Sequence, residues 1–423
     1  MLTLTTLRNH RERVIHALAK RNFDAKDAID GILSLDSDRR QTQAKLDDLL
    51  AQSNALSKQI GGLMREGKKQ EAEEIKAQTG DLKAQIPGLR DQMHALESGI
   101  LEALCQIPNT PCSLVAAGNS EADNEIVSEG GVPADLPHGA MPHWEIADKF
   151  GLIDFDLGAK VTGAGFPFYR GKGAKLQRAL IQFFLDRADN AGYEEFIPPH
   201  VINSASGFGT GQLPDKEGQM YHMAEDDLYM IPTAEVPLTN IFRDVMLTES
   251  ELPKKLCGYT PCFRREAGSY GKDVRGLNRL HQFDKVEIVQ IAHPDDSYDT
   301  LDDMVEHVRG LLEALELPYR VLRLCGADMG FTSALTYDFE VWSAAQERWL
   351  EVSSVSNFET YQANRLKCRF KGADGKSQLV HTLNGSALAL PRIVAAVLEN
   401  HQTADGVAIP VALQSYCGFA KID

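Results

Sequence analysis

The first hundred residues carry a hydrophobic pattern whose steps alternate between three and four residues. The first series with this spacing comprises Ile32, Leu35, Arg39, Thr42, Leu46, Leu49, Ser53, Leu56, Ile60 and Leu63. The second series comprises Ile75, Leu82, Ile86, Leu89, Met93, Leu96 and Ile100. Polar residues fill the other positions, and a mean repeat of about 3.5 residues is typical of helices that pack as coiled coils. The pattern therefore predicts two long helices in succession.

A short break between the two series predicts a turn. Gly67, Lys68 and Lys69 stand in this break, so we expect the helices to fold back as an antiparallel hairpin. About 38 residues in each helix, at about 1.5 Å per residue, would make an arm about 57 Å long. A coiled coil that dimerises two chains is the simpler interpretation of the pattern alone, although a hairpin that satisfies its own seam needs no second chain. The heptads do not identify what the arm contacts.

A segment without periodicity separates these helices from the rest of the chain. Residues 107–124, IPNTPCSLVAAGNSEADN, contain Pro, Gly, Asn and Ser in a mixture typical of a linker. Beyond this segment, helical stretches such as residues 175–192 alternate with short β-branched and aromatic runs such as KVEIVQIA and YRVLRL. We therefore expect an α+β domain built on a mainly antiparallel β-sheet flanked by helices.

Length and composition narrow the class of protein. The chain has 423 residues, of which 43% are hydrophobic and 25% charged, so two globular domains are expected. It contains no apolar run long enough to span a membrane and no signal peptide at its start, which predicts a cytoplasmic protein without a membrane partner. The seven cysteines form no CxxC pair and no HExxH motif occurs, so neither a disulfide framework nor a structural zinc site is expected.

The charge distribution limits how the chain could bind nucleic acid. The formal net charge is −16, which argues against nonspecific binding to polyanions such as DNA, because such binding begins with Lys and Arg at phosphates. Residues 1–110, however, hold 16 basic and 16 acidic side chains, so the whole deficit lies in the C-terminal body. Any nucleic-acid contact must therefore be local and directed by shape.

The candidate chemistry lies in two segments with charged residues among apolar ones. GAGFPF and GTGQLP lack the third glycine of dinucleotide motifs, and RGKGAK lacks Walker spacing. In CFRREAG, a strand would place Arg264 and Glu266 on one face and Arg265 on the other, which could be no more than an ion pair. In GLNRLHQFDKVEIVQ, a second strand would carry the following residues on one face: Arg279, His281, Phe283, Lys285 and Glu287.

Two such strands side by side would suit a mononucleotide. Arg guanidinium groups match phosphate oxygens, a Phe ring can stack on a purine, and a carboxylate can accept a hydrogen bond from an amine. ATP is the natural candidate ligand.

The residues from FRREAG to KVEIV resemble motif 2 of class II aminoacyl-tRNA synthetases, in the form found in bacterial seryl-tRNA synthetases. GYEEFIPPHVI, with Pro199, resembles the dimer-forming motif 1, and TAEVPLTN resembles the serine-binding loop. EVSSVSNFETYQANR and HTLNGSALALPRIVAAVLEN resemble the late ATP segment and motif 3. The helical hairpin, the GTGQLP loop and the IPN linker also match, so the resemblance covers nearly the whole chain.

The resemblance implies roles for individual residues toward ATP. Arg264 would bind the α-phosphate and the serine carboxylate, Glu266 would accept from the adenine amine, and Arg279 would bind the γ-phosphate. Phe283 and Arg392 would enclose the adenine ring. Glu351 and Ser354 would ligate Mg²⁺. The ATP-binding set implied by the family is Arg264, Arg265, Glu266, Phe283, Glu351, Val352, Ser353, Ser354 and Arg392, with Arg264, Arg279 and Arg392 as catalytic residues.

For serine, the resemblance implies a pocket made of Thr233, Ala234, Glu235, Arg264, Glu287 and Ser386. Glu287 would accept from the substrate hydroxyl. Each residue has a structural alternative: Thr233 could cap a helix with Glu235 in its first turn, and Ser386 could be a turn residue. Motif 3 departs from the family pattern at Ala387 and at Pro391, which removes a backbone donor beside Arg392.

The resemblance also implies the fold, the reaction and the partners. Residues 1–110 would form a tRNA-binding domain with the arm, residues 111–135 a linker, and residues 136–423 a class II catalytic domain. The enzyme would form seryl-adenylate and pyrophosphate from L-serine and ATP with Mg²⁺, then load tRNA(Ser), with tRNA(Sec) as a second candidate, and would act as a homodimer. Two other functions stay open: a ligase that loads a carrier protein, and an inactive paralogue that serves as a binding protein.

Overall fold

The computed structural model describes residues 1–266 and 275–423, which separate into two compact units. The first unit contains Met1–Ala19 and Phe23–Pro108, and the second contains Lys20–Asn22 and Asn109–Asp423. The two units are described below one at a time.

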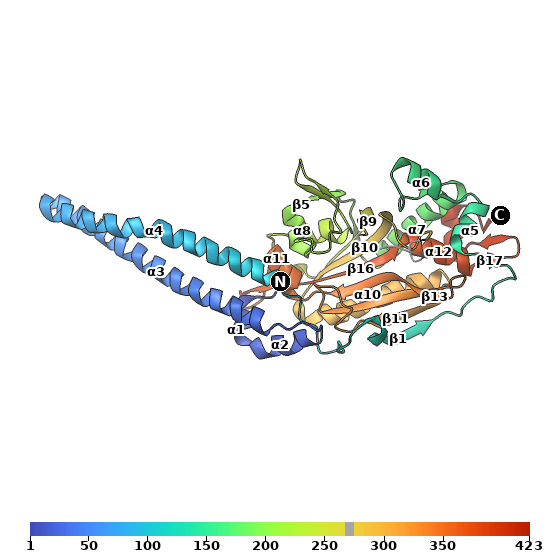
Figure 1. Cartoon of the computed structure of the whole chain (residues 1–423), viewed down its shortest axis with the longest axis horizontal. Coiled ribbons are helices and arrows are strands. Elements are labelled where there is room, and N and C mark those ends of the chain that lie inside the picture. Colours follow the sequence, from blue (N-terminus) through green and yellow to red (C-terminus); the bar gives the residue numbers. More distant parts are fainter. Residues whose placement is uncertain (267–274) are drawn as a thin grey trace. The chain divides into compact units, whose positions relative to one another are not determined.

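The first unit is dominated by a long helical hairpin (Figure 1). Helices α1, Leu4–Asn9, and α2, Arg11–Ala19, precede α3, Lys26–Arg65, and α4, Lys69–Leu104. Gly67 lies between the long helices with a φ of 79°, a left-handed conformation that glycine adopts without steric cost. The predicted hairpin and the position of its turn are confirmed.

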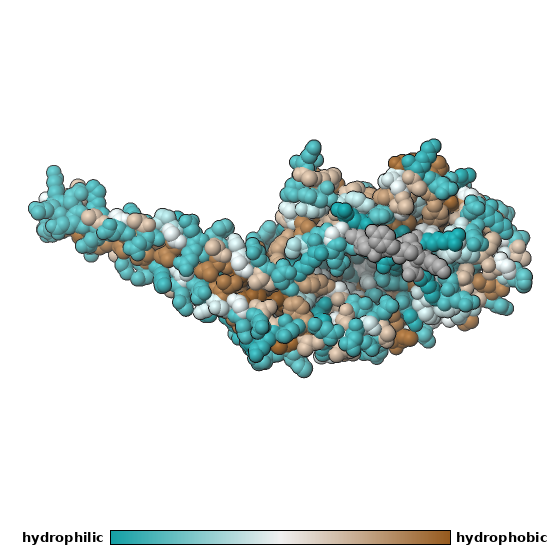
Figure 2. All heavy atoms as spheres, in the orientation of Figure 1, coloured by the Kyte–Doolittle hydropathy of each residue, from teal (hydrophilic) through white to brown (hydrophobic). Residues whose placement is uncertain are grey.

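The seam of the hairpin pairs residues that are equally distant from Gly67. Leu35, for example, lies 3.9 Å from the position that a Cβ on Gly99 would occupy. Figure 2 shows hydrophilic side chains at the tip and hydrophobic ones along the line between the helices. Arg39 is partly buried, as is Leu35 of the same predicted series, while the neighbouring Asp36 is fully buried. The Asp36 carboxylate is compensated by ion pairs with Arg8, Arg39 and Arg40.

The second unit is built on one large sheet. Among the described residues its strand order is β1, Glu125–Gly130; β11, Tyr319–Arg323; β12, Leu335–Ser343; β13, Arg348–Asn357; β16, His381–Ala389; β10, Gln282–Ala292; β9, Lys254–Phe263; and β4, Glu194–Glu195. Neighbouring strands are antiparallel except for β4, which runs parallel to β9 at the edge. The expected fold class is confirmed, while the segment expected to be a linker contributes the opposite edge strand, β1.

Helices cover the sheet through two clusters of buried apolar residues. Side chains of α7, Gly171–Asn190, α10, Ser297–Ala314, and α12, Leu390–Asn400, share the larger cluster with Val286 and Ile288 of β10. Helices α9, Glu235–Asn240, and α11, Thr360–Leu366, pack against Val289 and Ile291, which project from β10 to the other side. The alternation along β10 therefore gives each face of the sheet its own core.

Shorter elements complete the second unit. The helices are α5, His143–Lys149; α6, Phe155–Val161; α8, Ser204–Thr210; and α13, Val411–Cys417. The small sheets are β2, Ile153–Asp154, with β3, Phe168–Tyr169; β5, Val201–Asn203, with β6, His222–Met223, and β7, Leu228–Met230; β8, Met246–Thr248, with β14, Arg369–Lys371, and β15, Ser377–Leu379; and β17, Gln402–Thr403, with β18, Gly406–Ala408, and β19, Lys421–Ile422. No helix among the described residues is long and apolar enough to cross a membrane.

Candidate active site

The candidate site is built around the face of β10 that carries Phe283, Lys285 and Glu287. These residues alternate on one strand, as predicted. The strand begins at Gln282, however, so Arg279 and His281 precede it, and β9 ends at Phe263, before Arg264. The prediction that Arg264 and Glu266 project from a strand is therefore wrong. Glu266 has a φ of 48°, which lies outside the extended backbone region of a strand.

Glu287 is the most enclosed acid of this face. Its side chain is 2% exposed. Its Oε2 atom lies 2.5 Å from Nζ of Lys285 and accepts a hydrogen bond from Oγ1 of Thr233 at 3.2 Å. Burial raises the pKa of Glu287, whereas Lys285, Thr233 and Arg264 favour its charged form. The pocket therefore holds a carboxylate that has partners and can still accept further hydrogen bonds.

A second buried carboxylate stands beside the first. Glu235 begins α9, and its Oε1 accepts a hydrogen bond from Nε2 of Gln362 at 2.6 Å. Gln362 is itself fixed by Thr382, whose Oγ1 donates to its Oε1 at 2.7 Å. Burial, followed by repulsion from Glu287, raises the pKa of Glu235 from 4.5 to about 7. A cation in this pocket would relieve both effects.

The structural alternatives for the serine pocket can be judged against this geometry. Ala234, fully buried, is the N-cap residue of α9, and the hydroxyl of Thr233 both accepts from the backbone N–H of Glu235 and donates to Glu287. Thr233 is thus more than a capping residue. Ser386 lies inside β16, directly opposite Glu287, rather than in a turn. The structure therefore brings Thr233, Glu235, Glu287 and Ser386 together.

Arg264 and Arg279, the arginines expected to bind phosphates, each contact another residue of the expected ATP site. The guanidinium of Arg264 lies 5.1 Å from the ring centroid of Phe283, and its Nε donates to the carbonyl of Pro232 at 3.4 Å. Arg279 donates to Oε2 of Glu266 at 2.9 Å. The contacts Arg264–Phe283 and Arg279–Glu266 each join a residue before the stretch 267–274 to one after it. This stretch belongs to the expected motif 2 and lies outside the described residues.

Arg392 occupies the first turn of α12 and donates to two backbone carbonyls. Its Nη1 contacts the carbonyl of Glu351 at 2.5 Å, and its Nε contacts the carbonyl of Asn278 at 3.3 Å. Pro391 lies in the first turn of the same helix, where a backbone N–H has no partner within the helix. The proline therefore removes no hydrogen bond of the helix. Ala387, the other departure from the family pattern, is fully buried in the larger apolar cluster.

The expected metal ligands lie on β13 next to an unpredicted acid. Val352 has no partner on β12, because Ser353 pairs with Phe339 and Glu351 with Glu340. This bulge shifts the alternation, so Glu351 and Ser354 can share a face. The hydroxyl of Ser354 donates to Oδ1 of Asp338 at 2.5 Å.

Burial and the nearby carboxylate of Glu351 raise the pKa of Asp338 well above its usual range. Carboxylate and hydroxyl oxygens of this kind fit a hard cation such as Mg²⁺. The described residues contain no cluster of three or more His, Cys, Asp or Glu that could hold a metal ion alone.

The other residues expected to bind ATP make ordinary backbone, packing and side-chain contacts in the structure. The backbone N–H of Arg265 donates to the carbonyl of Gln219. Val352 is buried in the larger apolar cluster, and Ser353 donates to the carbonyl of Ser386. Sequence reasoning missed Gln362 and Asp338, because neither stands in a local pattern that separates it from an ordinary polar residue.

The chain matches known proteins over its whole length. The family model "Seryl-tRNA synthetase N-terminal domain" matches residues 1–111, and the model "tRNA synthetase class II core domain (G, H, P, S and T)" matches residues 220–401. The serine–tRNA ligase of Salinibacter ruber is 53% identical, covering 100% of this chain and 99% of the relative. The crystal structure of seryl-tRNA synthetase from Pyrococcus horikoshii complexed with ATP has a TM-score of 0.92 at 33% identity, covering 100% of this chain and 99% of the other.

The antiparallel sheet, together with the match of residues 220–401 to the class II core domain, defines a class II aminoacyl-tRNA synthetase. Because relatives such as that of Neisseria meningitidis, 46% identical over 100% of both chains, match both units, the chain belongs to the seryl-tRNA synthetase family. Serine–tRNA ligase activity follows from this membership.

Proposed function

We propose that the second unit converts L-serine and ATP to seryl-adenylate and pyrophosphate, and then transfers serine to the 3′-terminal adenosine of tRNA(Ser). The observation that carries this proposal is the pair of buried carboxylates, Glu235 and Glu287, beside the guanidinium of Arg264. Serine carries an ammonium, a hydroxyl and a carboxylate, and this pocket offers a matching partner for each.

In the proposed complex, Glu235 binds the ammonium of serine and Glu287 accepts from its hydroxyl. Thr233 and Lys285 hold Glu287 in place and favour its charged form against the effect of burial. Alanine cannot donate the hydrogen bond that the hydroxyl of serine gives to this buried acceptor, and the loss of that bond costs more than a lost apolar contact. Threonine is excluded only by the space for one methyl group, so it is the expected error.

For ATP, we assign the α-phosphate to Arg264, the γ-phosphate to Arg279 and the faces of adenine to Phe283 and Arg392. The backbone around Arg265 and Val352–Ser353 completes the site, and Glu266 accepts from the adenine amine. Glu351 and Ser354, with Asp338 behind them, would hold Mg²⁺, which supplies charge neutralisation at the phosphates when it is bound.

The first step needs no general base, because the carboxylate of serine is ionised at neutral pH. Its oxygen attacks the α-phosphorus, a new O–P bond forms, and the bond to the β-phosphate oxygen breaks as pyrophosphate leaves. Arg264 and Arg279 favour this step by offsetting the repulsion between carboxylate and triphosphate. In the second step, a ribose hydroxyl of the tRNA attacks the serine carbonyl, loses its proton, and AMP leaves.

We assign tRNA binding to residues 1–110 through the helical arm, with tRNA(Sec) as a second candidate substrate. The match of residues 1–111 to the family's N-terminal domain supports this assignment. RNA recognition by shape and backbone suits a hairpin whose basic and acidic side chains balance. Residues 136–423 form the proposed catalytic domain, and residues 111–135 join the two domains in a cytoplasmic enzyme.

We further propose that the catalytic unit forms a homodimer through the motif 1 segment. Ile197 follows the edge strand β4 and is 88% exposed. An exposed large hydrophobic residue next to an edge strand is a liability in a monomer, because unpaired strand edges and apolar surface favour association. A second copy of this chain would cover both.

Binding of a seryl-adenylate analogue, measured by calorimetry, tests the assignment of the pocket. The E235Q and R264A variants should each weaken binding by about tenfold or more, because each removes a charged partner of the ligand. The control variant E225Q changes an exposed acid outside the site. Equal affinity for E235Q, R264A and the unchanged protein would refute the assignment.

A further inference from the structure

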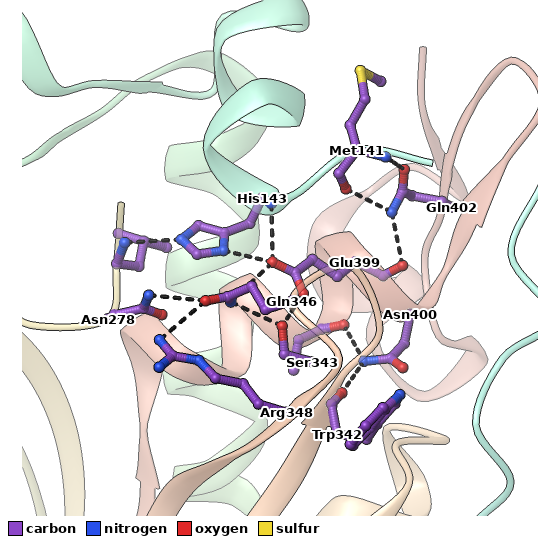
Figure 3. Close-up of polar contacts among 12 residues, drawn as sticks. Met141, His143, Asn278, Trp342, Ser343, Gln346, Arg348, Glu399, Asn400 and Gln402 are labelled. Carbon is purple, nitrogen blue, oxygen red and sulfur yellow. Dashed lines mark hydrogen bonds and ion pairs between the residues drawn. The ribbon is translucent and has the colours of Figure 1, made fainter. Parts of the chain in front are cut away.

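A buried pair of titratable side chains lies outside the proposed substrate contacts. His143, at the start of α5, and Glu399, near the end of α12, are both fully buried. Nδ1 of His143 lies 2.7 Å from Oε1 of Glu399, which also accepts from the backbone N–H of His143 at 3.0 Å. The two residues are 256 positions apart in the sequence. Figure 3 shows them at the centre of a polar network.

The other ring nitrogen of His143 holds the chain that leads to Arg279. The backbone N–H of Leu277 donates to Nε2 of His143 at 2.9 Å. Because a backbone N–H can only donate, Nε2 carries no proton, and the proton is on Nδ1, where it is donated to Glu399. His143 is thus a neutral imidazole that accepts on one side and donates on the other.

Glu399 is held ionised by several donors. Ser343 donates to its Oε2, and Nε2 of Gln346 donates to its Oε1 at 3.3 Å. Burial alone would raise its pKa, but the hydrogen bonds from His143 and Ser343 more than offset this, and the pKa of Glu399 is lowered. A carboxylate with this many partners has little freedom to move, so it orients the imidazole.

The same network reaches two of the arginines assigned to ATP, Arg279 and Arg392. Oε1 of Gln346 accepts from Nδ2 of Asn278 at 3.1 Å, and the carbonyl of Asn278 accepts from Nε of Arg392 at 3.3 Å. Arg279 follows directly, while Leu277 precedes Asn278. The segment from Leu277 to Arg279 is therefore fixed from two sides, by His143 through its backbone and by Gln346 through its side chain.

The close approach of the chain to His143 leaves no space for a side chain at Gly276. This glycine has a φ of 67°, and a Cβ there would lie 2.3 Å from Nε2 of His143. The guanidinium of Arg275 lies 4.8 Å from the ring centroid of Trp144, the residue after His143. The chain therefore packs against the start of α5 immediately before Arg279.

We propose that His143 and Glu399 are positioning residues for ATP: they fix the backbone from Leu277 to Arg279 and thereby place Arg279 and Arg392 for the nucleotide. This inference rests on the proposed ATP site. It predicts an effect on the binding of ATP but not on that of serine, because Thr233, Glu235 and Glu287 have no contact with this network among the described interactions. A pair that served stability alone would not distinguish the two substrates.

Asparagine and glutamine at position 143 separate the two functions of the imidazole. In H143N, the amide nitrogen would take the place of Nδ1 and could donate to Glu399. In H143Q, the amide oxygen would take the place of Nε2 and could accept from the backbone N–H of Leu277. We expect H143N to raise the KM for ATP in serine-dependent pyrophosphate exchange about tenfold, as for one lost buried hydrogen bond, with the KM for serine within about twofold. H143Q should restore most of the affinity for ATP.

Three further variants make the result decisive. Q346A, in the turn between β12 and β13, releases Asn278 and removes the 3.3 Å hydrogen bond from Gln346 to Glu399, but leaves the contact between His143 and Glu399 in place. It should also raise the KM for ATP, which covers the case that H143N fails to fold. H138N changes an exposed histidine in the same segment and should change neither constant. R279A tests the ATP site itself.

If R279A raises the KM for ATP while Q346A and the folded variants of His143 leave it unchanged, the positioning role is wrong and the ATP site stands. An equal rise in the KM for serine and for ATP also overturns it, since that marks general damage to the fold. If R279A leaves the KM for ATP unchanged, the proposed ATP site fails and the positioning role fails with it.

Discussion

At the scale of single residues, charge compensation decides how the proposed serine pocket works. Glu287 has Lys285 at 2.5 Å, whereas Glu235 has a neutral amide donor, Gln362, as its hydrogen-bond partner. The pKa of Glu235 is accordingly raised to about 7 by burial and by Glu287. The ammonium of serine would supply the missing positive charge, so binding of serine and ionisation of Glu235 are coupled.

This coupling predicts a pH dependence with a definite sign. Because serine binds the ionised form of Glu235, the KM for serine should rise as the pH falls below about 7, by up to about tenfold per unit, and should level off above it. The change is measured by pyrophosphate exchange between pH 5.5 and 8 with ATP saturating. E235Q should bind serine weakly and lose the dependence, and an unchanged profile in E235Q would contradict this role.

The same group should influence stability in the absence of serine. The folded-state pKa of about 7 lies above the ordinary value of 4.5, so the folded protein binds more protons between these values. Its contribution to stability is therefore present below pH 4.5 and is lost as the pH rises through 7. Serine should reverse this loss, which the difference in Tm with and without serine at pH 6 and pH 8 would show.

Single residues also mark the limits of prediction from sequence. Phe283, Lys285 and Glu287 could be placed on one face because strand alternation is local. The arrangement of Arg264 and Glu266 could not, since β9 ends at Phe263 and the backbone turns at Glu266. Roles for Thr233 and Ser386 came from family resemblance, and His143 was not recognised at all because its partner Glu399 lies 256 residues away.

At the scale of elements, irregular strands and edge strands carry the functional geometry. The bulge at Val352 lets Glu351 and Ser354 share a face, and no repeat in the sequence signals it. The hairpin, in contrast, could be predicted in position and length, because a heptad pattern extends over many turns. The burial of Asp36 could not be predicted from this pattern, because it depends on arginines from two helices.

The edge strand β4 yields a prediction about assembly. The Ile197→Asp substitution should convert the proposed dimer to a folded monomer, because a carboxylate cannot be buried at the apolar contact without a partner. Light scattering after size exclusion gives the molar mass. Val132→Asp is the matched control, since Val132 is 85% exposed but follows β1 at the opposite edge of the sheet. A dimer that survives Ile197→Asp would refute motif 1 as the interface.

At the scale of the whole molecule, the two units should divide the reaction between them. Arg40 and His94 are equally distant from Gly67, so residues 41–93 can be replaced by a short glycine-rich turn that rejoins α3 and α4. This shortened chain should keep pyrophosphate exchange within about twofold, because the proposed adenylation site lies in the second unit. Charging of tRNA(Ser) should fall by roughly 100-fold, since the phosphate and shape contacts of the arm are lost.

The two assays of the shortened chain are read together. Loss of both activities would indicate that the arm supports the fold of the catalytic unit, and retention of both would show that tRNA is bound elsewhere. Either result would contradict the proposed division. A match of residues 1–111 to the seryl-tRNA synthetase N-terminal domain also separates this chain from ligases that load carrier proteins, which lack such an arm.

Serine-dependent exchange of pyrophosphate into ATP, measured without tRNA and with threonine, alanine, glycine and cysteine in parallel, tests the central claim most directly. Strong exchange with serine, weak exchange with threonine and none with alanine is the predicted result, because Glu287 requires a hydroxyl and the pocket limits one extra methyl. Equal exchange with alanine would contradict the role of Glu287. No exchange with any amino acid, from folded protein with Mg²⁺ present, would contradict the adenylating site as a whole.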